Sequence, residues 1–366
     1  MSLLQFITAI PWDVRRGSGC YVGTRTLLEA LRELGIEVAL VTPRITTPIY
    51  TATRVLFNET LRRRHFSGDA TIGIDVDGYA IAGTPAGLPH VACIKGVLGD
   101  AVPFERGATR ASMAFQARLE ACHARRADLV ITVSQYCASR IEELYRVKNA
   151  VVVPELIDLR GWRRLFQSNP AVPDPRKFTA LSVCRFYPRK RLNVLLQAVA
   201  LLRDRLPQLE VRIVGRGPEY RRLRQLSSEL RVESMLCWLG DVNADTLAAE
   251  YNRSDMFCLP SVQEGFGIVF LEAMAAGKPI VGARIAAIPE VVRSGILVQP
   301  ENPEALADAI LLLYRDPDGR ESLASAGLRE VEQFDMRRVA ARFISEVAKI
   351  VPALKSVQHL GAEHAS

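Results

Sequence analysis

Short apolar runs alternate with amphipathic stretches along both halves of this chain. The apolar run Leu3–Ile10 precedes a segment, residues 27–34, in which leucines recur at helical spacing, and the apolar run Glu37–Thr42 follows it. Strand, helix and strand in this order are typical of parallel, doubly wound α/β sheets. The first half has further candidate strands at Thr71–Asp75, Val91–Ile94, Leu129–Val133 and Ala150–Val153.

A polar segment with three prolines, residues 167–176, interrupts this alternation. It offers few side chains that could pack, so we interpret it as a linker between domains. The alternation then restarts, with apolar residues at helical spacing over 192–202. The pattern predicts one domain over 1–166 and another over 177–336. Candidate strands of the second half are Phe178–Val183, Glu210–Val214, Leu236–Leu239 and Met256–Leu259.

The composition is that of a globular protein: 49% of the 366 residues are hydrophobic and 24% are charged. No apolar run is long enough to span a membrane, and Leu3–Ile10 fits a first buried strand better than a signal peptide. The seven cysteines are scattered without a C-x-x-C pair, which favours free thiols in a reducing compartment. We therefore expect a cytoplasmic protein.

The net charge of +7 is modest, and Arg62-Arg63-Arg64 is the densest basic cluster. Such an excess fits phosphate-bearing ligands or peripheral contact with an anionic membrane, although a solvated basic face explains it equally well. It is too diffuse, and too poor in interleaved aromatics, to predict nucleic-acid binding. The histidines lack ligand spacing and Asp75-Val76-Asp77 fits a strand end and turn, so we predict no metal.

The segment from Pro260 to Pro279 carries the most specific chemistry. It predicts a strand end, a loop with Gly265 and Gly267, and then a helix that Gly277 terminates. Backbone amides at a helix start bind anions, and glycines let the backbone approach a diphosphate closely. Glu264 in the loop and Glu272 in the helix would face one crevice at the carboxyl edge of the sheet. The alternative is an ordinary loop and helix with two solvated glutamates.

Two further segments in the second half are candidates for phosphate binding. Arg185 and Lys190 lie five residues apart after the strand Phe178–Val183, where two cations could clamp a diphosphate and stabilise a leaving group. Gly215-Arg216-Gly217-Pro218 superficially suggests a dinucleotide fingerprint, but it lacks the third glycine and the acidic residue that would follow.

The run from Glu264 to Glu272 resembles the E-x7-E signature of the retaining family 4 glycosyltransferases, the "group 1" enzymes of the GT-B class. Both the spacing and the E-G-F-G and E-A-M-A-x-G-x-P context are present. The resemblance implies that Glu264 contacts the donor sugar and Glu272 the nucleotide ribose. It also implies that the loop amides hold the diphosphate and sugar, which assigns donor binding to Gly265, Phe266, Gly267 and Ile268.

Other segments are similar to the same family. Arg185 and Lys190 match its R-x4-K diphosphate ligands, and the turn at Arg216 matches its G-x-G-P turn, which makes Arg216 a donor-site candidate. Val242 falls where the family's backbone contacts the nucleobase. The loop Gly17-Ser18-Gly19 is similar to a glycine loop near the diphosphate and acceptor. The resemblance is strong over 178–315 and weaker over 1–165.

From the resemblance we expect a GT-B fold: two doubly wound, Rossmann-like parallel-sheet domains facing across a cleft, with a final helix at 337–350 packed back on the first. The implied reaction transfers a hexose from a nucleotide diphosphate sugar to a hydroxyl acceptor, with retention of configuration, and needs no metal or other cofactor. Arg185, Lys190 and the helix start at Gly267 would stabilise the departing diphosphate.

The chain departs from the family at three places. Lys95 stands where many members have a histidine near the reacting sugar, Ala286-Ala287 replaces a Gly-Gly turn, and Pro154-Glu155 replaces Pro-Asn. We expect Lys95 to touch the donor or the acceptor. Two alternatives stay open: a GT-B nucleotide-sugar epimerase or hydrolase, against which the Glu264/Glu272 spacing argues, and a catalytically silent, glycosyltransferase-like partner subunit, which Lys95 and Ala286-Ala287 suggest.

Overall fold

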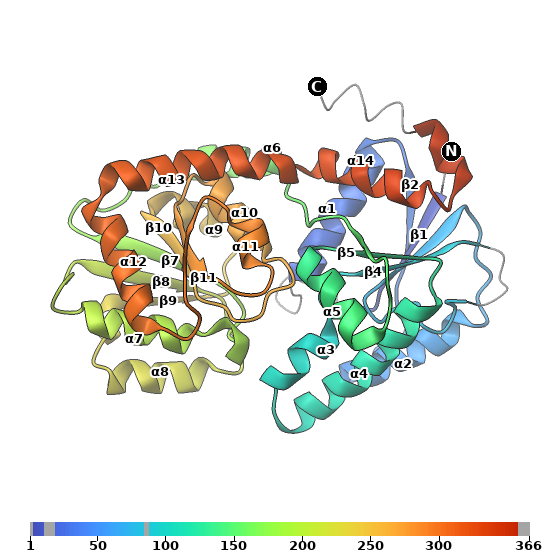
Figure 1. Ribbon diagram of the computed structural model, residues 1–366, viewed down its shortest axis with the longest axis horizontal. Coiled ribbons are helices and arrows are strands. Elements are labelled where there is room, and N and C mark those ends of the chain that lie inside the picture. The colour runs from blue at the N-terminus through green and yellow to red at the C-terminus, as the bar shows by residue number, and fades with distance from the viewer. Residues whose placement is uncertain (1–2, 11–18, 84–87, 358–366) are drawn as a thin grey trace. The chain divides into compact units, whose positions relative to one another are not determined.

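The computed structural model describes residues 3–10, 19–83 and 88–357, and its chain forms two compact units. Unit 1 combines Met1–Leu156 with Phe334–Ser366, and unit 2 is Ile157–Gln333. Each unit is a parallel β-sheet covered by helices (Figure 1). None of the helices in the described residues is long and apolar enough to cross a membrane.

The sheet of unit 1 has six parallel strands in the order β2-β1-β3-β4-β5-β6. The chain adds β2 on one side of β1 and β3 on the other, so the sheet has a topological switch point between β1 and β3. The strands are β1 (Leu3–Ile7), β2 (Glu37–Val41), β3 (Ala70–Ile74), β4 (His90–Ile94), β5 (Leu129–Thr132) and β6 (Val151–Val152).

The core of unit 1 includes the last long helix of the chain, α14 (Met336–Val347). Its apolar face is buried against α1 (Gly19–Glu33) and the sheet, and the ring of Phe343 stacks on Phe6 with centroids 6.3 Å apart. The other helices of unit 1 are α2 (Tyr50–Leu61), α3 (Leu98–Ala101), α4 (Gly107–Arg126), α5 (Gln135–Tyr145) and the 3-10 turns η1 (Val102–Phe104) and η5 (Pro352–Val357).

The sheet of unit 2 also has six parallel strands, in the order β12-β11-β10-β7-β8-β9. From β7 the chain adds β8 and β9 on one side and then β10, β11 and β12 on the other, so the switch point lies between β7 and β10. The strands are β7 (Phe178–Val183), β8 (Leu209–Val214), β9 (Leu236–Gly240), β10 (Met256–Leu259), β11 (Ile280–Ala283) and β12 (Ile296–Val298).

Helices between these strands complete unit 2. They are α6 (Leu159–Ser168), α7 (Leu192–Leu202), α8 (Tyr220–Glu229), α9 (Ala244–Arg253), α10 (Ile268–Ala275), α11 (Ile288–Val291), α12 (Pro303–Arg315) and α13 (Pro317–Glu330), with the 3-10 turns η2 (Pro188–Lys190), η3 (Glu233–Met235) and η4 (Val331–Phe334).

The fold class predicted from the sequence, α/β with two doubly wound parallel sheets, is confirmed. The proline-rich segment 167–176 contains only the end of α6 and no further element before β7. The chain passes between the units earlier, at Leu156–Ile157. The reason is that α6 packs on α9: the amide of Asn252 donates to the carbonyl oxygens of Phe166 and Asn169, both at 2.9 Å.

Candidate functional site

In open α/β sheets, ligands bind at the carboxyl ends of the strands beside the switch point. In unit 2 these ends are those of β7 and β10. The segment after β7 carries Arg185 and Lys190, and the segment after β10 carries Glu264. The topology therefore brings three of the predicted site residues to the same edge of the sheet.

Lys190 and Glu264 form a direct contact there. The Lys190 ammonium donates to Oε1 of Glu264, and the two side chains are 13% and 8% exposed. The backbone supports the pair, because the amide of Val262 donates to the carbonyl oxygen of Arg189 at 2.9 Å. A cation that water partly reaches at a sheet edge can exchange its partner for a charged ligand.

Arg185 and Arg216 lie on either side of Asp241. Nη1 of Arg185 is 3.4 Å from one carboxylate oxygen of Asp241, and Nε of Arg216 is 3.9 Å from the other. These side chains are between one third and three quarters exposed, so the contacts are weak. Both guanidinium groups are available to an anion. Val242, the predicted base contact, is the next residue and is partly buried.

Close backbone packing explains the two glycines of the G-R-G-P turn, Gly215 and Gly217. A Cβ at Gly215, where φ is +117°, would lie 2.0 Å from the carbonyl oxygen of Cys184, and one at Gly217 would lie 2.5 Å from the amide nitrogen of Phe186. The amide of Phe186 also donates to the carbonyl oxygen of Arg216 at 3.0 Å. The turn thus packs backbone to backbone against the segment that carries Arg185, a role distinct from dinucleotide binding.

In the sequence, α10 begins between Glu264 and Glu272. Gly267 is its N-cap, with φ of +94°, and a Cβ there would lie 2.6 Å from the ring of Phe270. The positive end of a helix favours an anion. The loop residues Gly265 and Phe266 precede this cap, and Ile268 is the first residue of the helix.

Glu272 lies one turn further along α10 and is 8% exposed. Its Oε2 accepts a hydrogen bond from the hydroxyl of Tyr251 at 3.0 Å. Burial raises the pKa of Glu272 to about 7, although the hydrogen bond from Tyr251 opposes the shift. The sequence did not single out Tyr251, and an aromatic residue on the inner face of a helix carries no signal that could have done so.

Lys95 of unit 1 lies at the end of β4, and its ammonium is 2.7 Å from Oε2 of Glu155. The two side chains are 3% and 4% exposed. Burial alone would lower the pKa of Lys95, but the charge of Glu155 raises it above its ordinary value. Contact between Lys95 and a ligand would require this pair to open. The sequence singled out both residues but not their pairing, which joins positions 60 residues apart.

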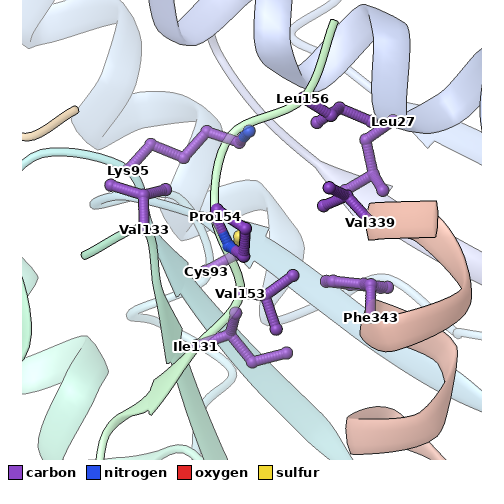
Figure 2. Close-up of a pocket in the computed structure, with 10 residues that line it drawn as sticks. All are labelled: Leu27, Cys93, Lys95, Ile131, Val133, Val153, Pro154, Leu156, Val339 and Phe343. Carbon is purple, nitrogen blue, oxygen red and sulfur yellow. The ribbon is translucent and has the colours of Figure 1, made fainter. Parts of the chain in front are cut away.

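Neighbouring groups enclose this pair. A Cβ at Gly23 of α1 would lie 2.2 Å from Oε2 of Glu155, so the glycine makes room for the carboxylate. Asp75 accepts from the backbone amide of Lys95 at 2.8 Å and from the thiol of Cys20 at 3.2 Å. Figure 2 shows Lys95 among the side chains that line a small cavity, the others being apolar residues that include members of α1 and α14. Its volume of about 10 Å³ is at the lower limit for one water molecule.

The Asp75-Val76-Asp77 segment follows β3 as a turn, as the sequence predicted. Asp77 is fully buried and accepts from Arg54 at 2.9 and 3.2 Å and from Asn58 at 3.1 Å. Over residues 3–10, 19–83 and 88–357, no three metal-ligating side chains converge. Of the predicted loop Gly17-Ser18-Gly19, the first two residues lie outside the described part of the chain, and Gly19 begins α1.

Comparison with known proteins supports the resemblance found in the sequence. Residues 164–330 match the model of the family described as glycosyl transferases group 1. The matched residues make up most of unit 2.

Two curated relatives are similar to this chain. D-inositol 3-phosphate glycosyltransferase of Pseudarthrobacter chlorophenolicus is 34% identical over 200 residues, which cover 52% of this chain and 48% of that protein. A GDP-mannose-dependent alpha-(1-6)-phosphatidylinositol monomannoside mannosyltransferase of Mycobacterium tuberculosis is 33% identical over 224 residues, 55% and 56% of the two chains. The chain spans about half the length of these relatives.

Among solved structures, sucrose-phosphate synthase of Thermosynechococcus elongatus is similar, with a TM-score of 0.80. The alignment covers 96% of this chain and all of that one, at 20% identity. At this identity the similarity establishes the fold, which is of the GT-B class.

Proposed function

We propose that this protein is a glycosyltransferase that moves a hexose from a nucleotide diphosphate sugar to a hydroxyl acceptor. One observation carries the proposal: at the switch point of unit 2, Lys190 pairs with Glu264 in the segment that leads to α10, and Arg185 follows the neighbouring strand β7 at the same sheet edge. Cations, helix amides and a carboxylate are the groups that a diphosphate sugar requires. The relatives' names, one of which specifies GDP-mannose, support the same class of donor.

The proposed mechanism separates two tasks. Arg185, Lys190 and the start of α10 stabilise the charge that grows on the departing diphosphate. Glu264 orients the sugar, and its contact with Lys190 keeps cation and carboxylate adjacent while the anomeric bond breaks. With retention of configuration, the acceptor approaches from the leaving-group side, and the leaving phosphate takes the acceptor proton.

We further propose that the reaction needs no metal. Arg185 and Lys190 supply positive charge at the diphosphate, which is the task that a divalent ion would perform. The support from unit 1 is that Asp77, the second acidic residue of the D-x-D segment, already accepts hydrogen bonds from Arg54 and Asn58. Addition of a chelator should leave turnover unchanged.

The acceptor is proposed to be a saccharide, lipid or small molecule with a free hydroxyl. Unit 1 has exposed arginines at Arg62, Arg63 and Arg64 after α2, which support peripheral contact with an anionic membrane. Co-sedimentation with vesicles that contain or lack anionic lipid tests this contact. The cytoplasmic location stays a prediction from the sequence.

A panel of UDP-, GDP- and ADP-sugars in a thermal-shift assay tests donor binding. A ligand at 100 times its Kd stabilises the folded protein by about 2.7 kcal/mol, so the correct donor should raise Tm clearly. Proton NMR of the product formed from an α-linked donor then reports the anomeric configuration. The proposal fails if none of these donors raises Tm.

The burial of Lys95 favours one second candidate, a silent partner subunit that binds the nucleotide sugar without transferring the sugar. Its ammonium is occupied by Glu155 at the place where the sequence predicted a catalytic contact. Binding in the thermal-shift panel without turnover on any acceptor would support this candidate. Release of free sugar from the donor alone would instead indicate a hydrolase, and a changed sugar an epimerase.

A further inference from the structure

Tyr251 is completely buried in unit 2, and its ring is held on several sides. It stacks on Phe257 with centroids 6.1 Å apart and makes T-shaped contacts with Trp162 and Phe166, with centroids 5.9 and 6.4 Å away. Trp162 and Phe166 belong to α6, the first helix after the chain enters the unit. A ring packed in this way has a fixed hydroxyl direction.

That hydroxyl points at Glu272. It lies 3.0 Å from Oε2 of Glu272 and 3.3 Å from the carbonyl oxygen of Val269, one turn earlier on α10. The described residues provide no further hydrogen bond to the Glu272 carboxylate, which is 8% exposed. One carboxylate oxygen is therefore fixed, while the other remains available to a ligand.

We propose that Tyr251 is a positioning residue that holds Glu272 in the orientation in which its free oxygen accepts hydrogen bonds from the hydroxyls of the donor's ribose. This inference rests on the proposed function, because it takes Glu272 to bind the ribose. Tyr251 itself lies beneath Glu272 and touches no ligand.

The pKa of Glu272 provides a second way to test this inference. Only the ionised carboxylate offers both oxygens as acceptors, and burial raises its pKa to about 7. The helices and strand packed against α10 are α6, α9, α13 and β11, and among their described groups Tyr251 alone opposes that shift. Removal of its hydroxyl should raise the pKa of Glu272 further. Nucleotide binding that depends on hydrogen bonds from the ribose hydroxyls to Glu272 should then require a higher pH.

The test uses Tyr251→Phe in the full chain, which deletes one oxygen and keeps the ring contacts. Calorimetric Kd values are measured for the preferred nucleoside diphosphate and for its 2′,3′-dideoxy analogue, from pH 5.5 to 9. In the wild type, loss of the ribose hydroxyls should weaken binding about tenfold at pH 8. In Tyr251→Phe the ratio of the two Kd values, dideoxy analogue over nucleoside diphosphate, should fall towards one at pH 8. The pH at which binding of the nucleoside diphosphate is half-maximal should move upward.

A matched control is Tyr145→Phe in unit 1, which also deletes a buried tyrosine hydroxyl bonded to a glutamate, Glu120. It should leave both Kd values unchanged. If Tyr251→Phe weakens both nucleotides equally, or neither, the positioning role is overturned while the proposed function stands. If the wild type binds none of the nucleoside diphosphates, the proposed function itself fails.

Discussion

The carboxyl edges of the two sheets both carry lysine–carboxylate pairs, but the pairs differ in exposure. In unit 1, Lys95 and Glu155 are 3% and 4% exposed. In unit 2, Lys190 and Glu264 are 13% and 8% exposed, and the nearby Arg185 is 32% exposed. A pair that water does not reach cannot exchange its partner for a ligand without an opening of the structure. From this difference we expect loss of Lys95 to act mainly on stability and loss of Lys190 mainly on ligand binding.

The largest expected effect comes from breaking the buried pair. Lys95→Ala leaves the Glu155 carboxylate buried without a partner, which should reduce the free energy of unfolding by about 3–5 kcal/mol. Urea unfolding, with hydrogen exchange in β4 and β6, measures the loss. The double variant Lys95→Met, Glu155→Met should recover most of it because no charge remains buried. A loss below about 1 kcal/mol for the single variant would show that water reaches this pair.

The equivalent change in unit 2 should act on binding. Lys190→Ala removes a cation that water reaches more than it reaches Lys95, so the loss in the free energy of unfolding should be smaller than that of Lys95→Ala. Affinity for the nucleotide sugar should fall about 100-fold, because a charge-assisted contact to the diphosphate is lost. Calorimetric titration beside urea unfolding measures both quantities. A stability loss as large as that of Lys95→Ala, with affinity intact, would remove the distinction between the pairs.

Gly23 of α1 makes space for Glu155, so a larger residue at this position tests how tightly the Lys95–Glu155 pair is enclosed. In Gly23→Ala the new methyl would lie 2.2 Å from a carboxylate oxygen that Lys95 holds in place. We expect a loss of about 1–3 kcal/mol in the free energy of unfolding, as for other overpacked sites. Gly96→Ala is the matched control, because a Cβ there has no atom within 4 Å. Equal stability of the two variants would mean that Glu155 can move aside.

The smallest expected effect concerns the turn where alanines replace the family's glycines. Ala286 has φ of +53°, a conformation that costs a non-glycine residue about 1–2 kcal/mol. Ala286→Gly relieves this cost but adds freedom to the unfolded chain, so stability should rise by about 0.5 kcal/mol. Ala287→Gly, at φ of −78° and fully buried, should instead lower it. Thermal unfolding of both variants checks the two signs.

The candidate site residues of unit 2 could be identified from the sequence because their signals are local. The spacing of Glu264 and Glu272, and of Arg185 and Lys190, is contained in short segments. Parallel strand topology then places the ends of β7 and β10 side by side. Tyr251 could not be predicted in the same way, since its contact with Glu272 depends on how α9 packs against α10.

Unit 1 shows the limit of local patterns more clearly. The sequence marks Lys95 and Glu155 as departures from a family pattern, and a lysine after a strand suggests an accessible cation. The fold instead places the carboxylate of Glu155, from the segment after β6, against it, and Gly23 of α1 lies next to that carboxylate. Whether the Lys95 ammonium is available to a ligand therefore depends on Glu155, which is 60 residues away in the sequence.

The sequence by itself determined the alternation of strands and helices, two parallel sheets, and the residues of the donor-side motifs, because periodicity and spacing are properties of neighbouring positions. Only the tertiary structure decided where the chain passes between units, which ionisable groups pair, and how far water reaches each pair. Burial is a property of packing between distant segments, and burial separates a charge that stabilises the fold from one that can bind a ligand.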